Sequence, residues 1–479
     1  MRRELIIDES PGYIRAAILE DGRLCEILSE KQTESDQTES LFYGRVQSVQ
    51  KSVGAAFVDI GEELNAFLPL EEGMKLRCGE MIILQGAAKQ ATETKGLRVT
   101  ARINLAGKWL VLIPGGCGVH ISKKVKDPAL REALKEIGLK ICPDEFGMII
   151  RTASGGVNRE LLEEEVSVLQ RRWHEILLKA SGMTRPGLLH RCEKLDIRLV
   201  RDLHDLTRIV TNSSSGYSAL LEAEHANRLN AGAEICLFEE CEQLIFDAYG
   251  IEPQIDKALK SRAWLPCGGY LVIDPCEAMT VIDVNSGKMI LGHDIDDMAL
   301  RVNLEAADEA ARQIRLRDIS GIIIIDFIDM KDEAARQKLI ERMKLAVKSD
   351  RAQVKVEGLT RLGLMEITRK RVHSPLSKIL RSGCSYCSGS GSVISADETA
   401  RRAIRQVRRM QISGQRGPFL IQCAPASAQL LEGMTCPVSG GSVYVQAVAG
   451  KHAERFEIKQ LGDGVPPPKG AASLNVRMD

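Results

Sequence analysis

The sequence predicts an α+β protein built as a mosaic of several domains, one of them a small β-barrel of the OB type. The chain has 479 residues, and at roughly 100–200 residues per domain this length predicts two to four folding units. Residues 41–112 are a series of short apolar runs broken by glycines, which is typical of a small barrel. Residues 268–329 read as strands around a long helix, which is typical of a mixed α+β unit.

The first 30 residues predict a pair of strands. Ser10-Pro11-Gly12 separates two apolar runs, and Asp21-Gly22 ends the second one. Asp-Gly between apolar runs is a strong hairpin signal. The polar stretch KQTESDQTES that follows predicts a surface loop or a linker.

The barrel is predicted from five runs, followed by a sixth run, WLVLIP. The five runs are LFYGRVQSV, VGAAFVDI, NAFLPL, EMIILQGAA and LRVTARI. Only 4% of residues are aromatic, yet Phe42, Tyr43, Phe57 and Phe67 all fall in this region. Barrels of this type bind single strands by stacking bases on exposed rings. The alternative is that these rings fill the barrel core.

Three helices are predicted between the barrel and residue 348. The first begins near Asn158, a suitable N-cap, because apolar residues recur after it at helical spacing. The other two cover about 296–317 and 331–348. Between them, GIIII is a continuous apolar run typical of a buried central strand.

Two aspartates at strand ends form the main candidate site. Asp283 and Asn285 lie in VIDVNSG, and Asp326 follows GIIII. A strand, a crossover helix and a parallel strand bring the two strand ends to one sheet edge. Two carboxylates placed in this way can hold a hard cation such as Mg²⁺, which can polarise a phosphoryl oxygen and activate a water.

The same acidic residues have a purely structural explanation. Aspartates at strand ends often cap the helices that follow, and spacing does not separate this role from metal binding. Asp329 is open to both explanations, as a further ligand or as a helix cap.

Cys384 and Cys387 form a C-x-x-C pair in the turn-rich segment SGCSYCSGSG. A structural zinc site needs four ligands, and the sequence contains no second pair of this kind. Three explanations stay open: a redox dithiol, a site completed by distant Cys or His residues, and a zinc ion shared by two chains. The Gly/Ser-rich turn favours zinc over the redox pair, because the pair does not open a helix.

The formal net charge is zero, with 65 Lys+Arg against 65 Asp+Glu. Contact with nucleic acid must therefore depend on local basic clusters, each of which is otherwise a solvated face. A capping box of Ser395 and Glu398 predicts a helix at 396–411 that carries one cluster. The clusters are Lys123, Lys124 and Lys126; Arg369, Lys370 and Arg371; and Arg401, Arg402, Arg405, Arg408 and Arg409.

Several classes of protein are disfavoured. There is no Walker A sequence, and GGCGVH is not a phosphate-binding fingerprint. The N-terminus lacks the apolar region of a signal peptide, and the longest aliphatic run, 322–325, is far shorter than the ~18 residues of a membrane span. We therefore expect no membrane span and a cytoplasmic protein whose 13 cysteines are mostly reduced thiols.

The order of these motifs resembles the ribonuclease E/G family. GRVQSVQKSVGAAFVDIG and NAFLPL are similar to its S1-type barrel. FGMIIRTAS, VIDVNSG, the long block NLEAADEAARQIRLRDISGIIIIDFIDM, LTRLGLMEITRKR and the cysteine turn follow in the family's order. The resemblance covers nearly the whole chain and is weakest after about residue 410. Because it has no long tail, the chain resembles the shorter ribonuclease G type of this family.

The resemblance implies roles for individual residues. Asp283 and Asp326 would bind a catalytic Mg²⁺, with Asn285 assisting at the phosphate. Phe57, Phe67 and Lys95 would contact RNA on the S1 barrel. A pocket for the 5′-monophosphate of the RNA would contain Gly107, Val111, Arg151 and Thr152. Cys384 and Cys387 would share a Zn²⁺ with a second protomer, giving a homodimer or a homotetramer.

The resemblance also implies domain boundaries. An RNase H-like part would comprise residues 1–36 and 215–278, interrupted by the S1 barrel at 37–118 and a 5′-sensor subdomain at 119–214. A DNase I-like catalytic subdomain at 279–382, a zinc knuckle at 383–392 and a small C-terminal domain at 393–479 would follow.

The implied function is a magnesium-dependent endoribonuclease that hydrolyses internal phosphodiesters of single-stranded RNA. Such an enzyme acts in rRNA and tRNA processing and in mRNA decay, and it leaves 5′-phosphate and 3′-hydroxyl ends. The alternative is a non-catalytic RNA-binding or ribosome-assembly factor that uses the S1 barrel.

Two departures from the family pattern affect these expectations. Gln353 stands where the pattern has a pocket arginine, which predicts weaker or different 5′-phosphate sensing. The cysteine turn reads C-S-Y-C where the family usually has C-P-x-C, which predicts a less rigid knuckle.

Overall fold

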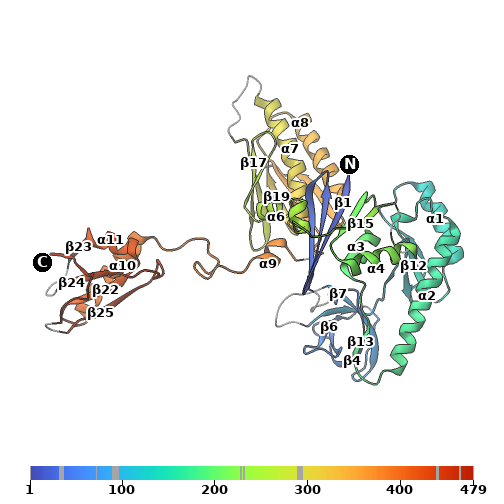
Figure 1. Ribbon diagram of the computed structural model, residues 1–479, viewed down its shortest axis with the longest axis horizontal. Coiled ribbons are helices and arrows are strands. Elements are labelled where there is room, and N and C mark those ends of the chain that lie inside the picture. Colours follow the sequence, from blue (N-terminus) through green and yellow to red (C-terminus); the bar gives the residue numbers. More distant parts are fainter. Residues whose placement is uncertain are drawn as a thin grey trace. The chain divides into compact units, whose positions relative to one another are not determined.

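The computed structural model describes residues 2–31, 37–71, 73–88, 96–226, 229, 232–287, 295–372, 374–437, 442–462 and 465–477. The chain divides into two compact units, Met1–Ile379 and Leu380–Asp479 (Figure 1). In the described part of the chain, no helix is both long enough and apolar enough to cross a membrane.

A five-stranded sheet in the first unit joins segments far apart in the sequence. Its order is β15-β14-β1-β2-β3, and β1 pairs in parallel with β14 about 200 residues later in the chain. The predicted Asp21-Gly22 turn joins β2 to β3, and both of its residues have positive φ. The strands are β1 (Arg3–Ser10), β2 (Tyr13–Glu20), β3 (Arg23–Lys31), β14 (Arg208–Thr211) and β15 (Glu234–Leu237).

Helices bury both faces of this sheet because its strands are apolar on both sides. Leu5 and Ile7 pack with residues of α3 (Leu195–Asp202) and α4 (Ser214–His225). Ile6 lies on the opposite face of β1 and packs with residues of α5 (Ile245–Ala248) and α6 (Glu252–Ala258).

The predicted barrel is present and closed. Strands β4, β5, β6, β8 and β7 pair in that order, and a β4–β7 pairing completes the circle. A sixth strand, β13, adds to the outside of β4 from much later in the chain. The strands are β4 (Leu41–Gln50), β5 (Ala55–Asp59), β6 (Ala66–Pro69), β7 (Met81–Ala88), β8 (Arg98–Thr100) and β13 (Gly187–His190).

The run WLVLIP, inside the range expected for the barrel, belongs to a different sheet. It forms β10 (Leu110–Pro114), which pairs with β12 so that the buried Leu112 faces the buried Met148. Long helix α2 (Arg159–Gly182) covers this sheet and begins beside the predicted N-cap, although the Asn158 side chain makes no capping hydrogen bond. The other members are β9 (Leu105–Ala106), β11 (Val119–Ile121), β12 (Phe146–Ile150), α1 (Pro128–Ile141) and the short turn η1 (Thr152–Ser154).

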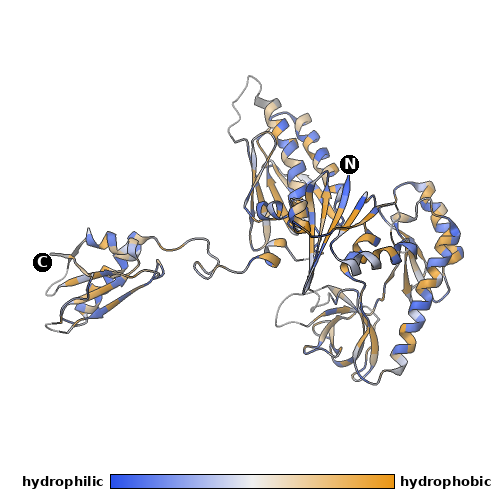
Figure 2. Ribbon diagram, viewed as in Figure 1, coloured by the Kyte–Doolittle hydropathy of each residue, from blue (hydrophilic) through white to orange (hydrophobic). Residues whose placement is uncertain are grey.

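A six-stranded sheet carries the two aspartates, in the order β16-β17-β18-β19-β21-β20. Helices α7 (Ile295–Leu316) and α8 (Glu333–Ala346) pack on one face and form its core (Figure 1). Both helices alternate between hydrophilic and hydrophobic residues, as expected when one side is buried (Figure 2). The strands are β16 (Arg262–Trp264), β17 (Tyr270–Pro275), β18 (Met279–Asn285), β19 (Gly321–Asp326), β20 (Val354–Leu359) and β21 (Leu364–Arg369).

The short turn η2 (Val347–Ser349) lies between α8 and β20, and the short helix α9 (Leu376–Leu380) follows β21 in the chain. The core of the second unit lies between a four-stranded sheet and two helices. The sheet order is β25-β22-β24-β26, and β23 and β27 form a separate pair. These elements are α10 (Ala396–Ile412), β22 (Phe419–Cys423), α11 (Pro425–Glu432), β23 (Thr435–Pro437), β24 (Val443–Ala447), β25 (Phe456–Gln460), β26 (Ala472–Ser473) and β27 (Asn475–Arg477).

Candidate active site and RNA-binding surfaces

Asp283 and Asp326 lie directly opposite each other. Strands β18 and β19 run in parallel, and their pairing register makes Asp283 and Asp326 Cα partners. Both side chains are exposed, whereas their neighbours Ile282 and Ile325 are fully buried under the helices. The two carboxylates therefore project from the same open face of the sheet, because side chains alternate between faces along a strand.

Asn285 belongs to the same site. It lies two residues after Asp283 on β18, and its Nδ2 donates a hydrogen bond of 2.6 Å to Asp283 Oδ2. This contact orients the carboxylate. The amide oxygen of Asn285 is an acceptor, so it can accept a hydrogen bond from a water or from a ligand.

Helix α7 fixes the loops that flank these strand ends. The buried Asn303 side chain donates to Ile328 O at 2.8 Å and accepts from Ile328 N at 3.0 Å, just after Asp326. Glu305 accepts from Cys267 N at 2.9 Å, in the turn before β17. The motif NLEAADE therefore contributes the side chains that hold the edge of the sheet that carries Asp283 and Asp326.

The donor set suits a hard divalent cation. Mg²⁺ is commonly held by one or two carboxylates, with water and substrate phosphate completing its shell. Asp283 and Asp326 supply two such oxygens on neighbouring strands. Among the described residues, no group of three or more His, Cys, Asp or Glu side chains gathers at a metal-sized site.

The alternative role of helix cap belongs to other residues. Helix α8 is capped by Asp332, whose carboxylate accepts from Ala334 N and Ala335 N, each at 3.1 Å. Asp329 is exposed and is not the cap of α8. Neither Asp283 nor Asp326 is the N-cap of a described helix.

The barrel aromatics divide between the core and the surface. Phe42 is 1% exposed and packs in the barrel core, as the structural alternative predicts. Phe57 and Phe67 are cross-strand partners on β5 and β6, and their half-buried rings meet edge to face with centroids 6.0 Å apart. These two rings form an aromatic platform on the outside of the barrel. Lys95, expected beside them, lies outside the described residues.

Gly107, Val111, Arg151 and Thr152 come together around β9, β10 and the end of β12. Arg151 N donates to Trp109 O at 2.8 Å, and Arg151 Nη1 donates to Gly107 O at 2.7 Å. Thr152 begins η1, where its hydroxyl lies 3.3 Å from the Ser122 hydroxyl. No hydrogen bond or ion pair of the Gln353 side chain occurs among the described residues; the side chain is exposed.

Gly107 is required by a close approach from helix α2. The Glu165 carboxylate accepts from the N–H groups of Lys108, Trp109 and Leu110 at 2.5, 2.9 and 3.0 Å. A Cβ on residue 107 would lie 2.6 Å from this carboxylate. Burial raises the pKa of Glu165 despite these three N–H groups. No local pattern predicts this role of Glu165, since its partners lie more than 50 residues earlier in the chain.

A separate groove of about 470 Å³ lies between α2 and β13. Its basic side chains are Arg171, Arg172 and Lys179, with His190 on the strand side. Burial, followed by the charge of Arg172, lowers the pKa of His190. None of the residues lining this groove comes from the sheet that holds Asp283 and Asp326.

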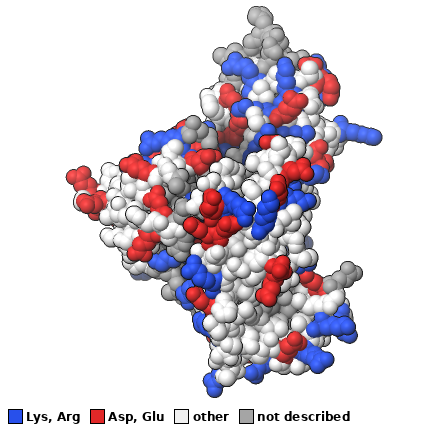
Figure 3. All heavy atoms as spheres, turned by 90° about the vertical axis from the view of Figure 1, so that its right-hand side faces the viewer, with Lys and Arg blue, Asp and Glu red and all other residues white. Residues whose placement is uncertain are grey.

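Three of the five arginines of the predicted helix pair with acidic residues of its first turn. Arg401 pairs with Asp397 at 2.9 Å, and Arg402 and Arg405 both pair with Glu398, at 3.1 and 2.7 Å. Ser395 caps the helix as predicted, accepting from Glu398 N. On the face of the first unit that Figure 3 displays, basic and acidic side chains are interspersed.

Cys384 and Cys387 lie in the turn-rich segment at the start of the second unit. Cys384 is exposed and Cys387 is half-buried. The N–H groups of Gly391 and Gly389, followed by the Cys384 thiol, lower the pKa of Cys387. A stabilised thiolate is the form that binds zinc, so the pair fits two of the four ligands of a tetrahedral zinc site.

Comparison with known proteins agrees with this arrangement. Residues 104–372 match the model of the Ribonuclease E/G family. Ribonuclease G of Escherichia coli strain K12 is 33% identical over 458 residues, covering 90% of this chain and 93% of that protein. Ribonuclease G of Haemophilus influenzae is 31% identical over 451 residues, covering 89% and 91%. Ribonuclease E of E. coli strain K12 is 33% identical over 420 residues, covering 82% of this chain and 39% of that longer protein.

The family-model match spans the sheet that holds Arg151 and the sheet that holds Asp283 and Asp326. With two relatives named ribonuclease G above 30% identity over most of both chains, the chain belongs to the ribonuclease E/G family.

Proposed function

We propose that this protein is an endoribonuclease that hydrolyses internal phosphodiesters of single-stranded RNA with the help of a divalent cation. The observation that carries the proposal is the in-register pairing of Asp283 with Asp326 on the open face of their sheet. The family relationship supports it, because the relatives that match over most of their length are named ribonuclease G.

The side chains of the site divide the work. The two carboxylates hold the cation, and Asn285 fixes the orientation of Asp283 through its 2.6 Å hydrogen bond. When bound there, Mg²⁺ supplies charge neutralisation at the phosphate and activation of a water. Water attack that expels the 3′-oxygen leaves a 5′-phosphate and a 3′-hydroxyl.

Substrate contacts are assigned to the first unit. The Phe57 and Phe67 platform stacks on unpaired bases, which requires a single strand because paired bases do not expose their faces. The pocket of Gly107, Val111, Arg151 and Thr152 receives a 5′-terminal monophosphate. Processing of rRNA and tRNA and decay of mRNA are the corresponding roles.

We assign Cys384 and Cys387 to a zinc ion shared by two protomers, because one chain supplies two of the four ligands needed. The protein is then a homodimer, and pairs of dimers give a tetramer. We also propose that the chain is divided into domains at the boundaries that the resemblance implies.

The test is cleavage of a short A/U-rich oligonucleotide by Asp283→Asn and Asp326→Asn variants. Each change removes a charged metal ligand while keeping its size, so we expect kcat to fall by at least roughly 10²-fold, with RNA binding unchanged. The matched control is Asp308→Asn on α7, which removes only an exposed ion pair with Arg342. EDTA should stop wild-type cleavage, and Mg²⁺ should restore it.

The alternative, a non-catalytic RNA-binding or ribosome-assembly factor, predicts the opposite. Binding would then persist in EDTA with no cleavage under any metal condition. Cleavage at the wild-type rate by either aspartate variant would remove the proposed metal site.

A further inference from the structure

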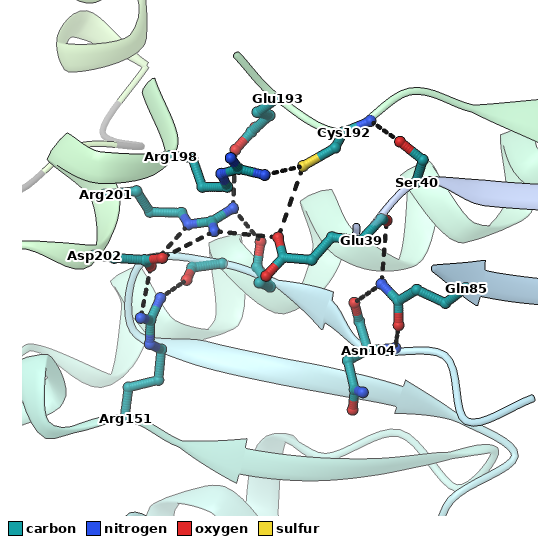
Figure 4. A network of polar contacts seen from close by, with 12 residues as sticks. Glu39, Ser40, Gln85, Asn104, Arg151, Cys192, Glu193, Arg198, Arg201 and Asp202 are labelled. Atoms are coloured by element: carbon teal, nitrogen blue, oxygen red, sulfur yellow. Dashed lines mark hydrogen bonds and ion pairs between the residues drawn. The ribbon is translucent and has the colours of Figure 1, made fainter. Parts of the chain in front are cut away.

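A chain of ion pairs leads from Arg151 through Asp202 and Arg201 to Glu193 (Figure 4). Besides donating to Gly107 O, the Arg151 guanidinium donates from Nη2 to Asp202 Oδ1 at 2.6 Å. Asp202 is the last residue of α3, and 51 positions separate the pair. The Arg151 side chain is 23% exposed, so it is not fully enclosed by the protein.

Asp202 is itself held in place by Arg201, the preceding residue of α3. Arg201 Nε lies 3.1 Å from Asp202 Oδ1, and Arg201 Nη2 lies 3.3 Å from Asp202 Oδ2. The Arg201 side chain is only 7% exposed, and its Nη1 donates to Glu193 at 2.9 Å. The Asp202 carboxylate therefore lies between two guanidinium groups.

Asp202 stays ionised in this setting. Its burial would raise its pKa, but the charges of Arg201 and Arg151 hold the pKa below its usual range. At any pH suited to an RNA assay, Asp202 is thus a fixed anion that orients Arg151 without changing its own charge.

The remaining donors of Arg151 suit a terminal phosphate. A guanidinium carries five N–H donors in a planar fork, and Gly107 O and Asp202 occupy two of them. The neighbouring backbone N–H groups of residues 108–110 are taken by Glu165. Recognition of an anion here therefore depends on where the Arg151 guanidinium points.

We propose that Asp202 is the positioning residue for 5′-end recognition. Arg201 holds the Asp202 carboxylate, and this carboxylate fixes the Arg151 guanidinium against Gly107 O. The remaining N–H donors of Arg151 are then oriented to bind a 5′-monophosphate. The inference rests on the proposed function, since it assigns a specificity role within that RNA pocket. A prearranged side chain binds more tightly because the ligand does not have to order it.

The experiment compares two RNAs that are identical except for a 5′-monophosphate or a 5′-hydroxyl. The measured quantity is the ratio of their kcat/KM values. For the wild type we expect a ratio well above one. In Asp202→Asn the ratio should fall towards one, while kcat/KM on the 5′-hydroxyl RNA changes less than about twofold, because the catalytic sheet is untouched.

Two further variants separate positioning from general damage. Arg151→Lys keeps the positive charge but loses the fork, so it should reduce the ratio in the same way. Adding Asp202→Asn to Arg151→Lys should lower the ratio no further, because the two changes remove the same interaction, the one between Arg151 and Asp202. The matched control is Asp205→Asn, an exposed aspartate three residues along that should leave the ratio unchanged.

If Asp202→Asn is too unstable to assay, Asp202→Glu keeps the charge and displaces it by one methylene, and it should give an intermediate ratio. A wild-type ratio of one, a ratio that rises in Asp202→Asn, or additive effects of the two changes would each overturn the proposal. If the wild type cleaved neither RNA, this result would instead refute the proposed function.

Discussion

At the scale of single residues, exposure decides which side chains are available for chemistry. Asp283, Asn285 and Asp326 alternate with buried aliphatic residues, so the pattern that builds the core also turns these polar groups to the open face. The sequence predicted all three residues correctly as strand-end groups. The register that makes Asp283 and Asp326 direct neighbours depends on the pairing of β18 with β19.

The barrel aromatics show the same principle with a mixed outcome. Four rings were candidates for stacking, and the strand pleat separates Phe42 in the core from Phe57 and Phe67 outside. A sequence without structure does not reveal which face of a barrel strand turns inward when apolar residues occur on both faces.

The platform predicts a binding defect. Phe57→Ala should weaken binding of single-stranded RNA by the energy of one stacked base, roughly 1–3 kcal/mol. The check is the Kd measured by fluorescence anisotropy on a 5′-hydroxyl oligonucleotide. The control is Leu64→Ala, which removes an exposed apolar side chain, 46% exposed, from the same barrel. Equal Kd values for Phe57→Ala and wild type would exclude a stacking role for this ring.

At the scale of elements, periodicity predicted helices well. Those expected at 296–317, 331–348 and 396–411 are found at Ile295–Leu316, Glu333–Ala346 and Ala396–Ile412. These helices carry clear apolar faces and, at 332 and 395, side chains that cap them. Strand partners were less predictable: β10 left the barrel for another sheet and β13 joined it, because pairing joins residues distant in sequence.

The cysteine knuckle gains its order from the small domain. Tyr386 stands between the two cysteines, and its ring stacks on His452 with centroids 4.2 Å apart. Tyr386 Oη accepts from Ala453 N at 3.2 Å, and the Tyr386 carbonyl oxygen is hydrogen bonded to the His452 ring. The absence of the family proline predicts a less rigid turn, and the contacts of Tyr386 connect this turn to residues 452 and 453.

This arrangement predicts how the zinc site responds to change. Cys384→Ser with Cys387→Ser should abolish zinc binding and convert dimers to monomers, as measured by metal analysis and light scattering. Tyr386→Ala should weaken zinc retention about 10–100-fold, the range expected when groups that orient ligands are lost. Tyr386→Phe keeps the stacked ring and should remain near wild type. A double cysteine variant that stays dimeric would reject the zinc bridge.

At the scale of the whole first unit, ion pairs join the N-terminal sheet to the sheet that holds Asp283 and Asp326 and to its helices. Arg315 of α7 pairs with Glu20 at 2.8 Å, and Arg351 pairs with Glu26 at 2.9 Å. Arg23 of β3 pairs with Glu309 of α7 at 2.6 Å. These contacts span about 300 positions in the sequence, so they hold together segments that local structure does not connect.

The pairs predict a pH dependence of stability. Burial would raise the pKa of Glu26, but Arg351 and Arg315 lower it below the ordinary value of 4.5. Because the folded pKa lies below the unfolded one, this contribution is present above about pH 4.5 and is lost as the pH falls through the folded pKa. Urea titrations from pH 7 to 3 should show the loss in the wild type.

A substitution isolates the contribution of Glu26. Glu26→Gln should lower the free energy of unfolding at pH 7 by roughly 3–5 kcal/mol and flatten its slope below pH 4.5, because the buried arginines lose their charged partner. The control is Glu136→Gln, which removes an exposed pair with Lys140 and should change little. Identical pH slopes for wild type and Glu26→Gln would contradict this assignment.

By itself, the sequence determined the helices, the barrel strands, the acidic residues at strand ends and the cysteine pair, because each depends on neighbours within a few positions. Tertiary structure alone decided the register that makes Asp283 and Asp326 direct partners, which rings lie outside the barrel and which anion holds Arg151. These features depend on strand register and on contacts across 43 positions for Asp283 and Asp326 and 51 for Arg151 and Asp202. Local patterns carry no record of such contacts, since many partners would satisfy the same residue equally well.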